Sequence, residues 1–393
     1  MPLRHRRTLA GGGDWTGTID ADALTRQPGS EEHVMRRLKV GVIGCGMVAQ
    51  VMHLPYLREL DDRFEIAALC DVSPGLLDVL SRDYQVGKTF IDYQEMLERA
   101  DLDAVMVLTQ LHAKPAIAAA KAGKHVFVEK PMVVNLEEAD ELIDTARANG
   151  AKVMVGYMKR YDPGYLAGLK EIEPVRDQVR LIELHDVIGP NAAFLTHHKI
   201  HRFDDIPREV LAQGAAERDE AYRKAVGDVP DHVKRAYGLM LGLSTHDVTI
   251  LRGAFDSPEE VLSVEIWNGG TYYTATMRYP GETRCVFYTG VMGIRRFDEK
   301  LTVFSPDRMV QISFPSPFLK STPTLVHVYE NRDGTHREET IVASYEEAFK
   351  EELIHFHDCV VGDREPRTNA LEGRKDTELL LQFVRTYLAQ HRA

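Results

Sequence analysis

A glycine-containing run at residues 44–49, with the sequence GCGMVA, stands between the apolar stretch LKVGVI and a segment of helical pattern. Gly44 permits a tight turn, and Gly46 lets the backbone approach a pyrophosphate because no side chain intervenes. The N-terminus of the following helix would face the negative phosphates. A plain tight turn shows the same spacing, but the strand before the run and the helix after it indicate a dinucleotide-binding loop. The loop residues expected to contact the dinucleotide are Gly44, Gly46, Met47 and Val48.

An acidic residue, Asp71, ends the next apolar stretch, EIAALCD. A carboxylate at this position accepts hydrogen bonds from both ribose hydroxyls and repels a 2′-phosphate, so Asp71 favours NAD over NADP as the cofactor. No arginine follows at once to hold a phosphate. The alternative is an aspartate that caps a helix or turn before Ser73-Pro74.

Two further residues have side chains suited to handling charge and protons. Lys130, in Glu129-Lys130-Pro131, follows the strand-like HVFVE and therefore lies at the carboxyl edge of a sheet, where ligands of open α/β sheets bind. An ammonium there can stabilise charge that develops on a substrate oxygen, although a lone lysine is usually a solvated surface residue. His246 lies in an amphipathic helical pattern that begins at Leu243. Imidazole suits proton transfer near neutral pH, but a histidine in a helix is more often structural.

Short apolar stretches alternate with helix-length segments over residues 38–157, which predicts a parallel sheet covered by helices on both faces. The strand-like stretches are LKVGVIG, EIAALCD, DAVMVLT, KHVFVEK and AKVMVGY. The helices are expected over residues 47–60, 74–84, 93–99, 113–122 and 135–149. This part of the chain is predicted to be an α/β nucleotide-binding domain.

After Tyr157 the pattern changes. One strand, VRLIELHDV, precedes a polar, helix-rich stretch at about 190–240, and alternating aromatic and β-branched residues follow. The alternating stretches LSVEIWNG, TYYTATMRYP, TRCVFYTG, KLTVFSP and VQISF predict an antiparallel sheet, and helices are expected near 344–360 and 371–391. We therefore predict a second domain, of the α+β class, over residues 158–393.

The composition excludes several classes of protein. The 393 residues include 48 Lys and Arg against 60 Asp and Glu, and this net charge of -12 repels nucleic acid and anionic lipid surfaces. No apolar run approaches the roughly 18 residues that a membrane-crossing helix needs. The four cysteines lack CxxC spacing, which favours a reducing cytoplasm. Residues 1–37 lack an apolar signal segment and are expected to form a flexible tail or an arm that packs on a neighbouring subunit.

Several of these segments together resemble the Gfo/Idh/MocA family of oxidoreductases. The resemblance rests on residues 44–49, His53-Leu54-Pro55, Cys70-Asp71, the segment AGKHV leading into Glu129-Lys130-Pro131, and His246-Asp247. It is strong over about 38–165, fair around 240–256 and faint elsewhere. It implies an N-terminal Rossmann domain with a doubly wound parallel sheet, followed by a domain with a large, mostly antiparallel open sheet. Because that sheet often makes subunit contacts in the family, a homo-oligomer, either a dimer or a tetramer, is expected.

The resemblance also implies a reaction and roles for single residues. The protein would transfer a hydride between NAD and a hydroxyl-bearing or carbonyl carbon of a sugar, cyclitol or glycoside, with His246 as general acid or base. The residues expected at the cofactor are Thr109 and His112, which follow the stretch DAVMVL, and Glu129 and Lys130, at the end of the stretch KHVFVEK. The residues expected at the substrate are Lys130, Tyr157, Arg160, His185 and His246.

One departure from the family concerns the acid/base group. Many members carry an aspartate four residues before the catalytic histidine, one helical turn away on the same face, and Gly242 stands there in this sequence. The acid/base role then falls more heavily on His246, with help from Lys130, His185 or Asp186.

A second departure is the stretch at about 188–240, which is longer than the family usually has. It contains His197-His198-Lys199-Ile200-His201, whose spacing matches no well-known metal-ligand set, so no metal is expected. A polar lid over the substrate and a solvated helical face remain the two interpretations.

Two other functions stay open. One is a glycosidase-like enzyme, in which transient oxidation beside the anomeric carbon allows elimination while bound NAD is regenerated. The other is a non-catalytic NAD-binding sensor or regulator, which the presence of both Lys130 and His246 disfavours and Gly242 keeps open.

Overall fold

The structure is a computed structural model that describes residues 36–391. Almost all of the tail predicted for residues 1–37 lies outside the described residues. None of the helices within residues 36–391 combines the length and apolar character that a membrane-crossing segment needs.

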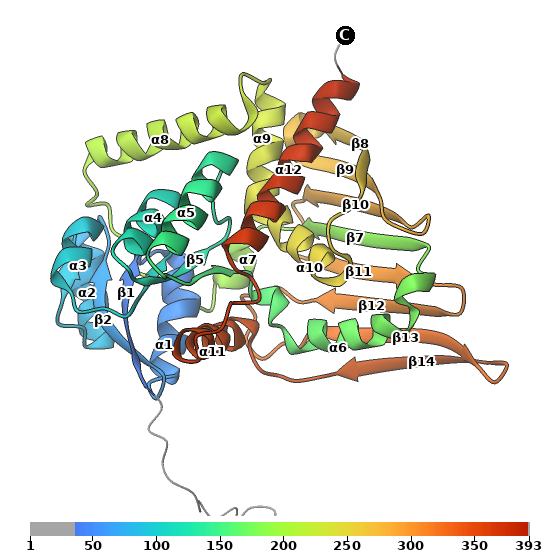
Figure 1. Cartoon of the computed structure of the whole chain (residues 1–393), viewed down its shortest axis with the longest axis horizontal. Coiled ribbons are helices and arrows are strands. Elements are labelled where there is room, and N and C mark those ends of the chain that lie inside the picture. The colour runs from blue at the N-terminus through green and yellow to red at the C-terminus, as the bar shows by residue number, and fades with distance from the viewer. Residues whose placement is uncertain (1–35, 392–393) are drawn as a thin grey trace, which may run out of the picture. The chain divides into compact units, whose positions relative to one another are not determined.

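Six parallel strands form the first sheet, in the order β3-β2-β1-β4-β5-β6 (Figure 1). They are β1 (Leu38–Ile43), β2 (Phe64–Cys70), β3 (Thr89–Phe90), β4 (Ala104–Val107), β5 (His125–Glu129) and β6 (Val153–Gly156). Apolar residues run almost continuously through the central strands because helices bury both faces. The strand order reverses between β1 and β4, which places a ligand crevice at their carboxyl ends. The sequence predicted all of these strands except β3, whose two residues are too few for a periodic signal.

Five α-helices of residues 36–157 surround this sheet, and three of them begin at a capping side chain. They are α1 (Leu54–Glu59), α2 (Pro74–Tyr84), α3 (Tyr93–Arg99), α4 (Ala113–Lys121) and α5 (Leu136–Ala148). The side chains of Ser73, Asp92 and Asn135 accept hydrogen bonds from first-turn N–H groups of α2, α3 and α5. A π-helical turn at Ala49–His53 joins the glycine loop to α1.

Eight strands form the second sheet, in the order β14-β13-β12-β11-β7-β10-β9-β8. They are β7 (Leu181–Ile188), β8 (Glu260–Trp267), β9 (Tyr272–Arg278), β10 (Arg284–Val291), β11 (Phe297–Phe304), β12 (Arg308–Phe314), β13 (Leu325–Arg332) and β14 (Thr335–Val342). Strands β7 and β10 are parallel, and the other neighbours are antiparallel, so the predicted fold class is confirmed. The sequence did not predict β13 or β14; the residues of β14 are mostly charged or polar and exposed on both faces, whereas β13 alternates buried apolar and partly exposed residues over its first half.

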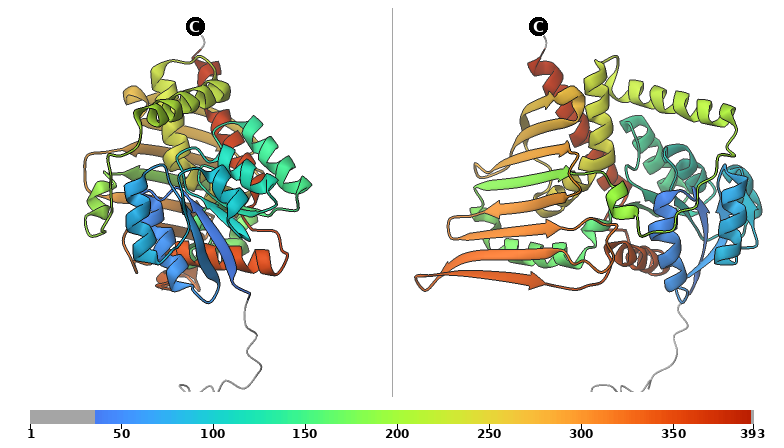
Figure 2. Two further views of the ribbon diagram at one scale, coloured as in Figure 1. Left: turned by 90° about the vertical axis from the view of Figure 1, so that its left-hand side faces the viewer. Right: turned by 180° about the vertical axis from the view of Figure 1, so that it is seen from behind.

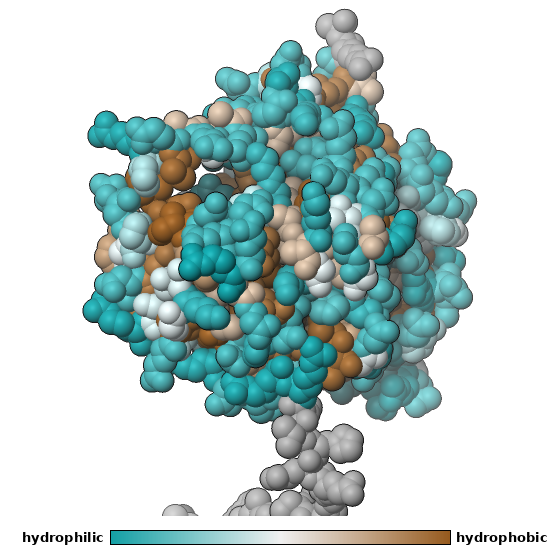
Figure 3. Space-filling model, turned by 60° about the vertical axis from the view of Figure 1, so that its left-hand side comes forward, coloured by the Kyte–Doolittle hydropathy of each residue, from teal (hydrophilic) through white to brown (hydrophobic). Residues whose placement is uncertain are grey.

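Three helices cover one face of the second sheet: α6 (Pro163–Ile172), α10 (Thr245–Phe255) and α12 (Ala370–Gln390) (Figure 1). The other face is turned to the viewer in the view from behind (Figure 2). The polar stretch between β7 and α10 forms α7 (Ala192–Leu195), the long α8 (Arg208–Val226), α9 (Asp231–Leu239) and a π-helical turn at Met240–Ser244. In the space-filling view, the surface is hollowed beneath the polar ridge of α8 (Figure 3).

The helix α11 (Ala348–Val361) returns to the first sheet although it follows the second in sequence. Phe356 is fully buried in the same apolar cluster as β1 and α1, and its ring meets that of Phe127 edge to face at 5.7 Å. The core of the first sheet is therefore completed by a segment some 190 residues beyond its last strand.

This arrangement predicts a large cost for truncating Phe356. We expect Phe356→Ala to lower the free energy of unfolding by about 3–5 kcal/mol, because it opens a cavity between α11 and the first sheet. Val361→Ala, at an exposed position of the same helix, is the control and should change stability by less than about 0.5 kcal/mol. Urea unfolding measures both, and equal stabilities would show that α11 does not belong to this core.

Candidate active site

The glycine loop leaves β1 and is held by the residue that ends β2. Gly44 has a φ of 89°, which favours glycine, and a Cβ there would lie 2.8 Å from the backbone of Leu108 and Thr109. The N–H of Cys45 donates to Asp71 Oδ2 at 2.8 Å. The predicted loop and the predicted carboxylate are thus neighbours at the crevice.

The space around the loop fits a dinucleotide. A Cβ at Gly46 would meet no atom within 4 Å, so the backbone is open to an approaching phosphate. Met47 and Val48 form the start of the following helix, whose first N–H groups are not used within it and can face an anion. The residues that would hold the pyrophosphate and ribose of NAD are therefore Gly46, Met47, Val48 and Asp71.

The loops after β4 and β5 form the next part of this edge. Thr109 Oγ1 donates to the carbonyl of Leu111 at 2.7 Å, and the buried His112 shares a 2.6 Å hydrogen bond with the carbonyl of Pro131. Glu129 bonds to His53 Nε2 at 2.8 Å and accepts from the N–H of Lys130 at 2.9 Å. Burial raises the pKa of Glu129, but its bond to His53 and the nearby cations outweigh burial and lower it overall.

Lys130 reaches from the first sheet to the turn that carries His246. Its Nζ donates to the carbonyl oxygen of Gly242 at 2.6 Å, in the π-helical turn directly before α10. A Cβ at Gly242 would meet nothing within 4 Å, so the space at this position is open. The structure therefore brings together the two side chains predicted to be catalytic, although they lie 116 residues apart.

A buried group of charges lies beside them. Asp186 on β7 and Glu299 on β11 are cross-strand partners, and Asp247 follows His246 on α10. Carboxylate oxygens of these three residues lie within 4.8 Å of one another. The buried Lys159 forms an ion pair with Glu299. Sequence reasoning did not single out Lys159 or Glu299, although Glu299 shares the inward face of its strand with Leu301 and Val303 and so marks a charge in a core position.

The protonation of this group follows from its burial. Both oxygens of Asp186 and of Asp247 lack a hydrogen-bond partner within residues 36–391. Burial, and then the neighbouring carboxylates, raise the pKa of Asp186 and of Asp247 well above the ordinary value. Two adjacent carboxyl groups without a donor are stable only when they hold a proton, so we describe them as one carboxyl pair.

Burial in the same surroundings lowers the pKa values of the two catalytic candidates, His246 and Lys130. Burial lowers the pKa of His246 well below its ordinary value, and the positive charges of Lys130 and Lys159 add to the effect. The pKa of Lys130 is also lowered, first by burial and then by Lys159. His246 is therefore a neutral imidazole at pH 7, and its Nδ1 has no partner among the described residues.

Three other residues predicted at the substrate lie around this cluster, not within it. Tyr157 is buried in the apolar core of the first sheet. Arg160 is buried and donates to the carbonyl of Thr249 on α10 at 3.1 Å. His185 stacks on Tyr288 at 4.9 Å on the opposite face from Asp186, because successive residues of a strand alternate between faces. The structure thus brings Asp186 to the cluster and His185 away from it.

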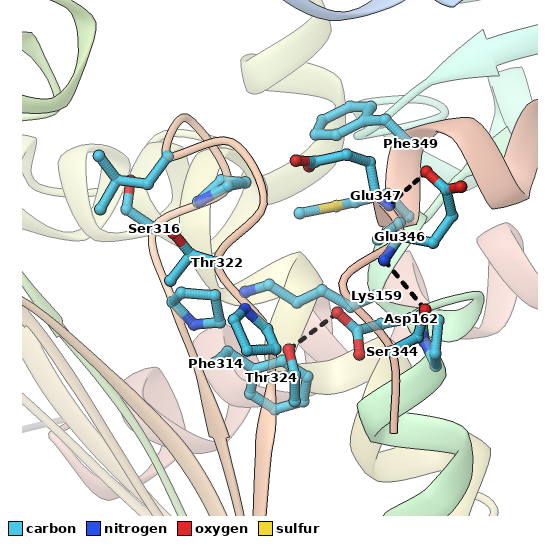
Figure 4. Close-up of a pocket in the computed structure, with 17 residues that line it drawn as sticks. Lys159, Asp162, Phe314, Ser316, Thr322, Thr324, Ser344, Glu346, Glu347 and Phe349 are labelled. Carbon is cyan, nitrogen blue, oxygen red and sulfur yellow. Dashed lines mark hydrogen bonds between the residues drawn. The ribbon is translucent and has the colours of Figure 1, made fainter. Parts of the chain in front are cut away.

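Lys159 also lines a separate cavity next to the β12–β13 connection (Figure 4). Phe314, Thr324 and the segment before α11 form its walls, and Thr324 Oγ1 donates to Asp162 at 2.8 Å. The ammonium of Lys159 lies 5.3 Å from the centroid of the Phe314 ring. Lys159 is therefore fixed between this wall and Glu299.

A known protein family is similar in sequence to the part of the chain that forms the first sheet. Residues 38–157 match the family described as "Oxidoreductase family, NAD-binding Rossmann fold". The matched residues make up less than half of the chain, and over them the chain is similar to the Gfo/Idh/MocA family. The match confirms the resemblance seen in the sequence over these residues, and the matched family is one that binds NAD.

Curated relatives match part of the chain. Inositol 2-dehydrogenase of Salmonella typhimurium is 33% identical over 133 residues, which are 33% of this chain and 39% of that protein. Myo-inositol 2-dehydrogenase of Thermotoga maritima is 30% identical over 211 residues, which are 49% of this chain and 62% of that protein. The aligned part thus spans less than two thirds of either relative.

Solved structures share the fold over more of the chain. Aldose-aldose oxidoreductase from Caulobacter crescentus has a TM-score of 0.69 and 18% identity, covering 91% of this chain and 99% of that one. Scyllo-inositol dehydrogenase from Lactobacillus casei has a TM-score of 0.67 and 19% identity, covering 91% and 98%. The two-sheet architecture is therefore common to these proteins.

Substituting the two glycines of the loop should affect different properties, folding stability for Gly44 and NAD affinity for Gly46. Gly44→Ala should lower the free energy of unfolding by about 1–3 kcal/mol, because the new Cβ meets backbone atoms at a positive φ. Gly46→Ala should keep wild-type stability and weaken NAD binding about ten-fold or more, because its Cβ enters the space open to the pyrophosphate. Urea unfolding measures the stability of both variants, and calorimetric titration measures their affinity for NAD. An unchanged NAD affinity in Gly46→Ala would contradict the assigned site.

Proposed function

We propose that the protein is an NAD-dependent dehydrogenase or reductase acting on a secondary hydroxyl or ketone of a sugar, cyclitol or glycoside. The contact between Lys130 Nζ and the carbonyl of Gly242 carries this proposal, because it joins the carboxyl end of β5 to the turn before His246. A cation, a neutral imidazole and a carboxyl pair then meet beside the dinucleotide crevice. The names of the relatives, inositol dehydrogenases and an aldose oxidoreductase, support a polyhydroxylated substrate.

The residues of the chain divide the chemistry between them. When bound, NAD accepts or delivers the hydride at its nicotinamide ring. Lys130 offers an ammonium that can exchange the carbonyl of Gly242 for a substrate oxygen and stabilise negative charge there. His246, neutral at pH 7, takes the hydroxyl proton at an imidazole nitrogen when the substrate is oxidised.

The carboxyl pair provides an acidic group close to His246, which the glycine at position 242 cannot provide. Asp186 and Asp247 hold a proton because their pKa values are raised by burial and by each other, and Asp247 is the next residue along from His246. In the direction of ketone reduction the protonated pair is an acid close to the reacting groups, where the imidazole itself is neutral. This role replaces the aspartate that many family members carry four residues before the histidine.

We also propose that the protein forms a homo-oligomer and is located in the cytoplasm. A homo-oligomer, either a dimer or a tetramer, is supported by the face of the second sheet opposite α6, α10 and α12, which carries the half-buried Tyr288 and the exposed Val286. The four cysteines are all free and buried, which supports the cytoplasm.

The decisive experiment compares His246 and Lys130 variants across a substrate panel. Purified protein is incubated with NAD and a set of inositols, aldoses and glycosides, and NADH formation is followed. For a substrate that reacts, we expect His246→Ala and Lys130→Met each to lower turnover about 10²- to 10⁴-fold, because each removes a group that acts on the reacting oxygen. NAD affinity of His246→Ala should stay within about three-fold of wild type, since the imidazole is not part of the dinucleotide loop.

His336→Ala, on the exposed strand β14, is the matched control and should keep wild-type turnover. Unchanged turnover in His246→Ala would contradict the assigned acid/base. Aglycone release that needs NAD without net NADH would replace the proposal with the glycosidase-like reaction. NAD binding without any turnover across the panel would favour a sensor.

The depressed pKa of His246 predicts the pH dependence of oxidation. The base acts when neutral, and a lowered pKa keeps it neutral to more acidic pH, so kcat/KM for oxidation should persist as pH falls through about 6.5 and decline only below it. The pH profile of kcat/KM with NAD in excess measures this limb. A half-loss of kcat/KM at or above pH 6.5 would contradict a neutral, buried His246.

A further inference from the structure

The segment between α7 and α8, residues 196–207, lies against the helices of the first sheet, and we call it the strap. The N–H of His201 donates to Gln50 Oε1 at 2.8 Å, and Gln50 Nε2 donates to the carbonyl of His201 at 3.2 Å. Gln50 lies in the π-helical turn directly after the glycine loop. The strap is part of the stretch that is longer than the family usually has, and neither the proposed reaction nor the comparisons give it a role.

Asp205 of the strap occupies the N-terminus of α2. Its Oδ1 accepts from the hydroxyl of Ser73 at 2.5 Å, and its Oδ2 accepts from the N–H of Gly75 at 2.7 Å. Helix α2 has 11 residues, and its first N–H groups are a natural site for an anion. The hydroxyl of Ser73 and then the N–H of Gly75 hold the pKa of Asp205 below its ordinary value, so the carboxylate is ionised at neutral pH.

The neighbouring Phe203 shows that the strap fits closely here. A Cβ at Gly75 would lie 2.6 Å from the Phe203 ring and 2.8 Å from Asp205 Oδ2. The absence of a side chain at Gly75 is therefore what allows the carboxylate to reach the helix end.

Ser73 links Asp205 to the residue that would bind the adenosine ribose. Its N–H donates to Asp71 Oδ1 at 2.9 Å, while its hydroxyl donates to Asp205. A carboxylate at the position of Asp71 binds the ribose 2′-hydroxyl, so a 2′-phosphate would project towards the start of α2. Hydroxyl and N–H donors that could hold such a phosphate are already bonded to Asp205.

We propose that Asp205 takes the place of the 2′-phosphate at the N-terminus of α2 and, together with Asp71, excludes NADP in favour of NAD. This inference rests on the proposed NAD-dependent function. It assigns the selectivity to a residue 134 positions beyond Asp71, contributed by the strap and not by the dinucleotide fold.

The test measures binding of both dinucleotides without turnover. Wild type, Asp205→Asn, Asp205→Glu and Asp204→Asn are titrated with NAD, and NADP is titrated directly or in competition with NAD. We expect Asp205→Asn to bind NADP about five- to thirty-fold more tightly than wild type, because it removes one repulsion of a dianionic phosphate at about 4 Å in water. NAD affinity should change by less than about three-fold, and the gain for NADP should shrink as salt screens the charge.

Two variants serve as controls. Asp205→Glu keeps the charge and should keep the rejection of NADP, and Asp204→Asn removes an exposed charge one residue away and should leave both affinities as in wild type. Because Asp205 is exposed, thermal unfolding should show that all variants fold.

The binding results distinguish failure of the inference on Asp205 from failure of the proposed function. Wild-type protein that binds NADP as tightly as NAD, or an Asp205→Asn variant whose NADP affinity is unchanged, overturns this inference and leaves the proposed hydride transfer in place. An equal gain in Asp204→Asn also overturns it, since the effect would then be one of general surface charge. Wild-type protein that binds neither dinucleotide contradicts the proposed function and this inference with it.

Discussion

The buried ion pair between Lys159 and Glu299 is the constraint on which the rest of the site depends. Both side chains are removed from water, and a buried charge is tolerated only when a partner holds it closely. Lys159 comes from the turn after the first sheet, and Glu299 lies on β11 of the second. Asp186 and Asp247 join the same group, so β7, β11 and α10 must meet at one place for any of these charges to be buried.

The helix that carries His246 is fixed by a second set of contacts. Arg252 on α10 donates to Asp376 at 2.5 Å and to Glu372 at 3.0 Å, both on α12. Arg160 also donates to the backbone of α10, at the carbonyl of Thr249. An imidazole that must meet substrate and cofactor within a narrow range of geometry gains from such a rigid support. The residues around the reacting groups thus act largely by positioning α10.

The two ends of the crevice are built differently. At the dinucleotide end, Asp71, Ser73 and Asp205 are bonded to one another and to the backbone, which leaves little freedom. At the substrate end, Gly242 leaves open space, and the donor that reaches it is the flexible Lys130 side chain. The cofactor end is therefore preorganised, while the substrate end can accept a polar group in place of the carbonyl of Gly242.

The sequence by itself determined the local features: the glycine loop, Asp71, and the strands with continuous or alternating apolar patterns. Lys130 and His246 were also predicted, because their flanking residues carry a family pattern. Only the tertiary structure decided that Lys130 meets the turn of Gly242, that Asp186 and not His185 faces the cluster, and that Lys159 pairs with Glu299. It also placed Asp205 at the end of α2 and α11 in the core of the first sheet. Local patterns depend on neighbours within a few residues, whereas these contacts join positions 100 or more residues apart, and burial of charge and apolar surface selects them only when the whole chain packs.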